Sequence, residues 1–346
     1  MFYGKQEARI VSGVAIVMMM IHHFFGFPDY LLPENHYISL FSFGDITVER
    51  LAAAFGKLCV AIFAFNSGYV LWQLPEKFSS WRLVSGRLIH FMESYWFVCA
   101  IFLVIGILSH DRLPDIAEFV RNLFGLSTGP AYLYVNVVFG WYVAFYISWL
   151  LLSPVLFALF NKSGGVIDLF LLVVLGLAID QLVSMQLDFL VPLKVALCGL
   201  LTAKYNVFEW LHRRWNVSAV IALFIIIIMI PIRQGLIFLN VPLTGFEDGL
   251  FAAVFIYAVV VIARCRWMSL VNKVFLFLSA YSMNMWYFHG LFFTGSKQFQ
   301  WLLYWPEYSI LILLWGIVMT LMLSIACDYL FRGLNFVFAK KIMKKK

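Results

Sequence analysis

The residues with the clearest chemical potential lie at the two ends of an apolar run near the start of the chain. Arg9 opens the segment RIVSGVAIVMMMIHHFFGF, and His22 and His23 lie near its end. In a helix that rises ~1.5 Å and turns ~100° per residue, His23 lies ~21 Å from Arg9 and about 40° round from it. The two side chains therefore share a face. Because imidazole exchanges a proton near neutral pH, His23 is a candidate general base.

A second interpretation of the same window stays open. A histidine at the polar interface of a membrane can be hydrogen-bonded and take no part in chemistry. His22 is rotated well away from the face that Arg9 and His23 share. We expect His22 to be such an interfacial residue.

Other polar side chains interrupt apolar runs further along the chain. Each is a site candidate, because polar groups are costly in hydrocarbon. Arg87, His90 and Glu93 follow a three-residue spacing that predicts roughly one helix face, either as an anion site or as a structural cluster. The remaining candidates are Asn66, Ser67, Gly68, Trp141, Tyr142, Tyr281, Ser282, Asn284, Trp286 and His289.

The elements that must position these residues are membrane-spanning helices. The chain has 346 residues, of which 63% are hydrophobic and only 12% charged, about half the charged fraction of a soluble protein. We predict an all-α, polytopic membrane protein with about ten helices around a polar passage. The expected spans are roughly 8–27, 51–73, 88–109, 132–160, 166–184, 189–204, 215–233, 247–264, 272–293 and 308–332.

The distribution of positive charge predicts the orientation. With the N-terminus in the cytoplasm, 18 of the 25 lysines and arginines fall on the cytoplasmic side and 7 on the other. Both termini are then cytoplasmic, in a multi-pass protein of the plasma membrane whose basic tail touches anionic lipid. No basic stretch indicates nucleic-acid binding. The five cysteines include no CxxC pair, so we expect neither a disulfide framework nor a metal site.

Four windows together resemble the acyltransferase-3 family of integral membrane acyltransferases. They are SGVAIVMMMIHH, VAIFAFNSGYVLW, GRLIHFMESYW and LSAYSMNMWYFHGLFF, in the order and spacing of that family. The resemblance covers nearly the whole chain and implies one transmembrane acyltransferase domain over 1–346. It further implies O-acyl transfer, usually of acetyl from acetyl-CoA as co-substrate, to a hydroxyl of a cell-surface or lipid-linked glycan of the bacterial type.

The resemblance also assigns roles to individual residues. It implies that His23 is the catalytic base or handles the acyl group. Arg87 would bind the phosphates of CoA, with Ser67, Gly68 and Tyr69 along the donor path. We place Asn66 and His90 with this donor set. On the acceptor side we place His289, with the further candidates Trp141, Tyr281, Asn284 and Trp286.

The chain departs from the family pattern at three positions. Ser12 stands where the family has its arginine, and Arg9, one turn earlier, could reach the same space, so both join His23 as catalytic candidates. His90 replaces a second arginine, and Glu93 replaces a proline.

Two rival functions stay open at this point. Intramembrane His, Arg and Asn residues would equally suit a transporter of a lipid-linked glycan or an anion. A membrane O-acyltransferase of another fold would also use one histidine.

Overall fold

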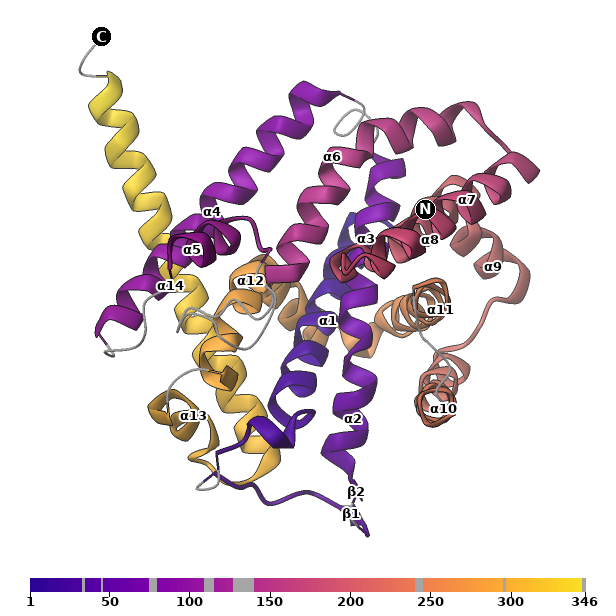
Figure 1. Cartoon of the computed structure of the whole chain (residues 1–346). Helices are drawn as coiled ribbons and strands as arrows, with labels where there is room; N and C mark the ends of the chain where they lie inside the picture. The colour runs from indigo at the N-terminus through magenta and orange to yellow at the C-terminus, as the bar shows by residue number, and fades with distance from the viewer. Residues whose placement is uncertain are drawn as a thin grey trace.

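The computed structural model describes residues 1–32, 35–44, 46–74, 80–108, 115–126, 140–239, 245–294 and 297–343. Nearly all of this part of the chain is helical (Figure 1). The first half contains α1 (Lys5–Phe25), α2 (Val48–Gly56), α3 (Leu58–Gln73), α4 (Trp81–Leu108), α5 (Ile116–Leu123), α6 (Gly140–Lys162) and α7 (Val166–Ser184). The second half contains α8 (Pro192–Lys204), α9 (Val207–Trp215), α10 (Ala219–Phe238), α11 (Phe246–Ala263), α12 (Ser269–Thr294), α13 (Lys297–Tyr304) and α14 (Ser309–Met343). The described strands, β1 (Ser42–Phe43) and β2 (Ile46–Thr47), pair antiparallel in a short hairpin.

The all-α class and the membrane character are confirmed, whereas the count of ten spans is not. Among the described residues, seven helices are long and apolar enough to cross a membrane, and the bent pair formed by 188–204 with α9 would make eight. The expected span 51–73 is divided into α2 and α3 at Lys57. The expected span 189–204 is only 13 residues long as α8, with Pro192 in its first turn as predicted. The expected span 132–160 begins within residues 127–139, which lie outside the described part.

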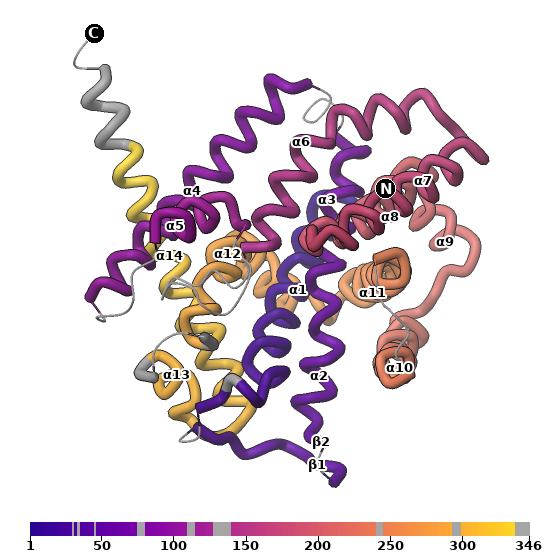
Figure 2. The backbone as a smooth tube through the Cα atoms, viewed as in Figure 1, coloured from indigo at the N-terminus to yellow at the C-terminus, as the bar shows by residue number. Residues whose placement is uncertain are grey.

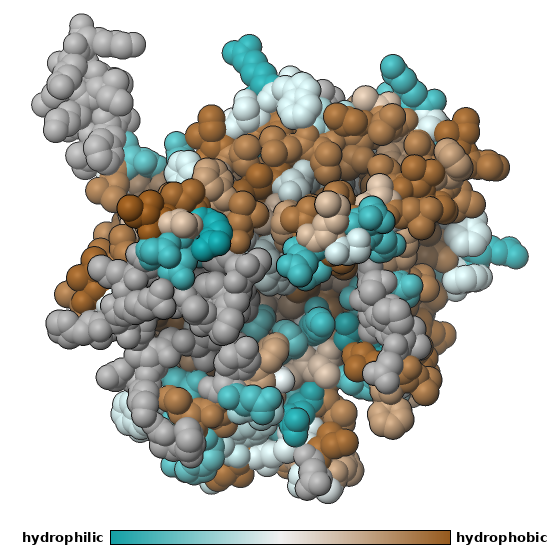
Figure 3. Space-filling view, viewed as in Figure 1, coloured by the Kyte–Doolittle hydropathy of each residue, from teal (hydrophilic) through white to brown (hydrophobic). Residues whose placement is uncertain are grey.

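The helices expose apolar side chains on the outside of the bundle. Along α7, Val166, Ile167, Leu169 and Phe170 are each more than half exposed. Figure 3 shows hydrophobic side chains gathered over α6 and α7. An outward apolar face of this kind is what hydrocarbon, not water, stabilises.

Helix α1 lies at the centre of the bundle, between α12 on one side and α2 and α3 on the other (Figures 1 and 2). The approach to α12 is very close: a Cβ atom at Gly13 would lie 2.2 Å from the carbonyl oxygen of Phe275. Only glycine allows this backbone separation, as is usual where membrane helices pack tightly. The close contact fixes α1 against α12, the two helices that carry His23 and His289.

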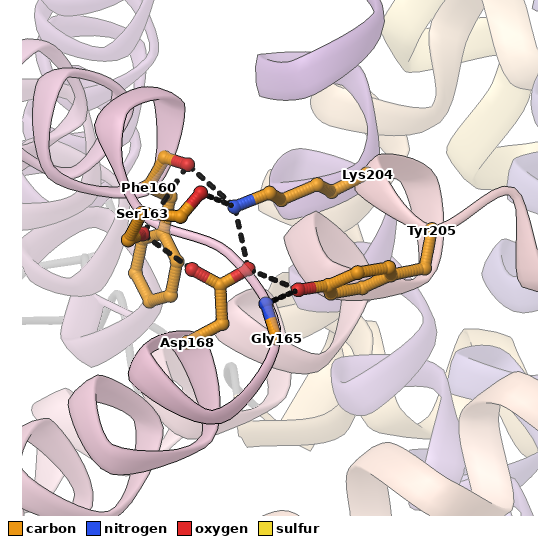
Figure 4. A network of polar contacts seen from close by, with 6 residues as sticks. All are labelled: Phe160, Ser163, Gly165, Asp168, Lys204 and Tyr205. Carbon is orange, nitrogen blue, oxygen red and sulfur yellow. Dashed lines mark hydrogen bonds and ion pairs between the residues drawn. The ribbon is translucent and has the colours of Figure 1, made fainter.

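Buried ion pairs hold the outer elements in place. The Lys204 ammonium lies 2.5 Å from a carboxylate oxygen of Asp168, and it donates to the carbonyl oxygens of Phe160 at 2.6 Å and Ser163 at 2.9 Å. Figure 4 shows these contacts converging on the lysine. The Tyr205 hydroxyl donates to the same carboxylate at 2.5 Å. Because Asp168 is only 1% exposed, this network ties α6, α7 and α8 together at one end of the bundle.

A second polar cluster closes the opposite end of the bundle. Glu49, at the start of α2, is 6% exposed and accepts hydrogen bonds from Leu40 N at 2.7 Å and Ser309 Oγ at 2.6 Å. Ser39 Oγ donates to the same carboxylate. This end also holds α13, whose Tyr304 hydroxyl donates to the Phe24 carbonyl at 2.5 Å. The cluster joins the loop after α1 to the starts of α2 and α14.

Candidate active site

A cavity of about 340 Å³ lies between α1, α3, α4, α6 and α12. Seven of its lining residues are aromatic, and one described lining residue, Arg87, is a cation. Its other polar lining residues are Ser12, Asn66, Ser67 and Ser282. A mostly apolar wall with a few polar groups is typical of sites for small organic ligands.

The catalytic candidates near the start of α1 separate in the structure. Ser12 lines the cavity, where its hydroxyl accepts a hydrogen bond from Asn66 Nδ2 at 3.4 Å and donates to Ala8 O at 2.9 Å. Arg9 is exposed and donates to Ser279 Oγ at 3.4 Å and Leu276 O at 3.2 Å. The family's arginine position is therefore a hydroxyl in the cavity wall, with Arg9 held against α12 outside that wall.

The prediction that Arg87, His90 and Glu93 share one helix face is wrong. Arg87 lines the cavity together with Phe91, four residues later. The side chains of His90 and Glu93 are 79% and 52% exposed and lie 4.0 Å apart. Each three-residue step falls ~60° short of a full turn, so two steps rotate Glu93 about 120° away from Arg87. Of these three residues, only Arg87 lines the cavity.

The three donor-path candidates on α3 also divide between two faces. Ser67 lines the cavity, and its hydroxyl donates to Phe63 O at 3.0 Å. Gly68 packs on α8, where an added Cβ would lie 1.7 Å from the Ala196 carbonyl oxygen. Tyr69 packs edge-on against Tyr3. Gly68 and Tyr69 are therefore not part of the described cavity wall.

The histidines near the ends of α1 and α12 meet. His23 on α1 and His289 on α12 have ring centroids 4.6 Å apart and are 7% and 0% exposed. Phe27 stacks on His23 at 5.7 Å, and the His22 ring lies 4.8 Å from His23. The His23 ring therefore faces the protein interior and not the surrounding lipid.

Backbone contacts orient both imidazoles. His23 Nδ1 lies 3.1 Å from Met19 O, and His289 Nδ1 lies 2.5 Å from Trp286 O. A carbonyl oxygen only accepts, so each Nδ1 carries the proton. In a neutral ring, Nε2 then holds the lone pair, which is the arrangement a general base requires. His22 Nδ1 contacts Ala53 O at 2.8 Å in the same way, which fits the expected hydrogen-bonded role.

The acceptor-side candidates are not all near the cavity. Trp286 lines it. Asn284 donates to Ser324 O on α14 at 3.5 Å, and Tyr281 packs against Phe277. Trp141 contacts Tyr142 at 5.9 Å but is outside the cavity wall.

The polar passage predicted along the bundle is interrupted at Trp286. The cavity lining reaches this indole and includes neither histidine. The Trp286 ring lies 6.3 Å from that of His289, and Phe63 and Tyr142 pack on it at 5.6 and 4.8 Å. A ligand in the cavity is thus separated from the histidine pair by the side chain of one residue.

Sequence reasoning missed the aromatic wall that α6 provides. The predicted acceptor side includes Trp141 from this helix, whereas Tyr142 is predicted only as a polar residue of the span and Tyr146 and Trp149 are not predicted at all. Tyr142, Tyr146 and Trp149 all line the cavity. Their i, i+4, i+7 spacing places them on one face of a helix, a pattern visible in the sequence.

Comparison with known protein families identifies a family for this chain. A family model described as an acyltransferase domain, the acyltransferase-3 model, matches residues 10–329. No curated protein and no solved structure matches the chain. Within the described residues, no three His, Cys, Asp or Glu side chains come close enough together to hold a metal ion.

Proposed function

Because the chain belongs to the acyltransferase-3 family and is a membrane acyltransferase, we propose that it transfers an acetyl group from cytosolic acetyl-CoA through the membrane. The acceptor is a hydroxyl of a cell-surface or lipid-linked glycan. The observation that carries the proposal is the buried His23–His289 pair beside an aromatic cavity that Arg87 lines. In this scheme both termini face the cytoplasm of a plasma-membrane protein.

The donor binds in the cavity. The planar guanidinium of Arg87 can donate two hydrogen bonds to one phosphate of CoA, which makes it the natural anchor for the charged end. The aromatic wall suits the neutral arm that carries the thioester. The acyl end then lies at Trp286, whose ring is 6.3 Å from that of His289, and the acceptor hydroxyl approaches it from the histidine side.

The reaction is a direct displacement. His23 Nε2 takes the proton from the acceptor hydroxyl, and the oxygen attacks the thioester carbonyl. The C–S bond breaks as the C–O ester bond forms, and the proton passes from His23 to the departing thiolate, giving free CoA thiol. His289 positions His23 from the adjacent helix, on the acceptor side.

The test uses purified protein in proteoliposomes with acetyl-CoA and a glycan extract. We expect free thiol that depends on the acceptor, and a mass increase of one acetyl group on the glycan. A transporter would release no thiol, and that result would contradict the proposal.

A further inference from the structure

Two buried indole N–H groups in the cavity wall have no hydrogen-bond partner. Among the described residues, neither Trp149 Nε1 nor Trp286 Nε1 donates a hydrogen bond. Trp149 is 1% and Trp286 6% exposed, and both line the cavity. Buried donors are nearly always paired in proteins, so unpaired donors in a cavity wall indicate a ligand that supplies the acceptors.

The chemistry of indole restricts what that ligand can be. An indole N–H donates and cannot accept, so the ligand atom facing it must be an acceptor. The described lining contains no carboxylate, Arg87 is a donor alone, and the serine and tyrosine hydroxyls and Asn66 of the lining can donate as well as accept. A sugar hydroxyl requires an acceptor for its proton, whereas a carbonyl oxygen only accepts. The wall therefore favours a ligand that is rich in carbonyl groups.

The Trp286 indole is held by its neighbours. Tyr142 packs on it at 4.8 Å and 32°, and Phe63 meets it edge-on at 5.6 Å and 81°. Such ring contacts fix an aromatic side chain in orientation as well as in place. Trp286 also accepts, through its carbonyl oxygen, the hydrogen bond from His289 Nδ1.

We infer that Trp149 and Trp286 bind carbonyl oxygens of the acyl-thioester arm, with Trp286 on the thioester carbonyl beside the histidine pair. This inference rests on the proposed function, and it assigns a role to Trp149, a residue outside the candidates proposed from the sequence. A carbonyl that gains negative charge during attack is stabilised by donors already in place.

The experiment measures binding without turnover, by titrating detergent-purified protein with acetyl-CoA and with S-ethyl-CoA, which lacks the carbonyl. Trp149→Phe and Trp286→Phe keep an aromatic ring and remove the donor. We expect wild-type protein to prefer acetyl-CoA over S-ethyl-CoA, and Trp286→Phe to lower the affinity for acetyl-CoA about five- to tenfold while leaving that for S-ethyl-CoA unchanged. In the proposed arrangement, the Trp149 donor faces an amide carbonyl of the arm, which both ligands contain. Trp149→Phe should therefore weaken the binding of both ligands equally. The control is Trp210→Phe, at an exposed tryptophan on α9.

Unchanged affinities in both variants would overturn the inference, as would an equal loss for both ligands in Trp286→Phe. Thiol release by the wild-type protein distinguishes a failure of this inference from a failure of the proposed function. If thiol is released and the variants behave like wild type, acyl transfer stands and the assignment of the indoles falls. If no thiol is released but the ligand selectivity depends on Trp286, the carbonyl site stands without the reaction.

Discussion

Arg87 is the one cation among the described residues of the cavity wall, and its planar fork makes it the group best suited to phosphate. We expect Arg87→Ala to raise the KM for acetyl-CoA about 10- to 100-fold, since a hydrogen bond to a charged group is worth about 1.5–3 kcal/mol, with a smaller change in kcat. Initial rates over a range of acetyl-CoA concentrations measure both constants. His90→Ala, at the exposed neighbour, is the control. An unchanged KM in Arg87→Ala would show that the arginine is structural.

For single residues, the sequence predicts which polar side chains are site candidates better than it predicts which of their helix neighbours face the cavity. His23, His289, Arg87, Ser67, Asn66 and Trp286 could be proposed because polar groups in apolar runs stand out. Gly68 and Tyr69 could not be separated from Ser67, because neighbouring residues of a helix point about 100° apart and the sequence does not say which face meets the cavity. The roles of all these residues stay predictions.

Helices α6, α7 and α8 are joined by the buried Asp168–Lys204 network. No sequence motif predicts this ion pair. We expect Asp168→Asn to cost about 3–5 kcal/mol of stability, because the Lys204 ammonium, only 10% exposed, would lose its counter-ion. The measurement is the thermal unfolding midpoint in detergent. Asp328→Asn removes the partner of the largely exposed Arg332 and should cost no more than about 1 kcal/mol. Equal midpoints for the two variants would contradict the assignment.

The elements that sequence reasoning placed best are the long apolar helices. The expected span 166–184 coincides with α7, and 247–264 differs from α11 by one residue at each end. The interruption at Lys57 and the shortness of α8 were harder to foresee. At the first of these, Gly56 lies so close to α1 that an added Cβ would be 2.6 Å from Met18 O, a tertiary contact that the sequence does not reveal.

At the scale of the whole molecule, the Glu49 carboxylate ties the loop after α1 to the start of α14, at the end of the bundle opposite the Asp168 network. Burial raises the pKa of the Glu49 carboxyl, but hydrogen bonds from Leu40, Ser309 and Ser39 outweigh it and lower the pKa below the usual value. A lowered folded-state pKa stabilises the protein above the unfolded value of about 4.3, and this contribution is lost as the pH falls through the folded value.

We therefore expect Glu49→Gln to lower stability by about 1–3 kcal/mol at pH 7, and to lower it progressively less as the pH falls below the unfolded value of about 4.3, because wild-type Glu49 then loses the advantage of its lowered folded-state pKa. Unfolding midpoints measured from pH 7 down to pH 3.5 check this. A constant difference between variant and wild type across that range would contradict it.

The proposed reaction joins the cavity that Arg87 lines to the buried histidine pair, and its decisive step is proton transfer to His23. The most direct measurement is acceptor-dependent release of CoA thiol by proteoliposomes containing wild-type protein, His23→Gln or the exposed control His90→Gln. We expect His23→Gln to lower kcat at least ~100-fold, the low end for loss of a general base, while acetyl-CoA binding and the His90→Gln rate stay near wild type. Thiol release by His23→Gln at the wild-type rate would contradict it.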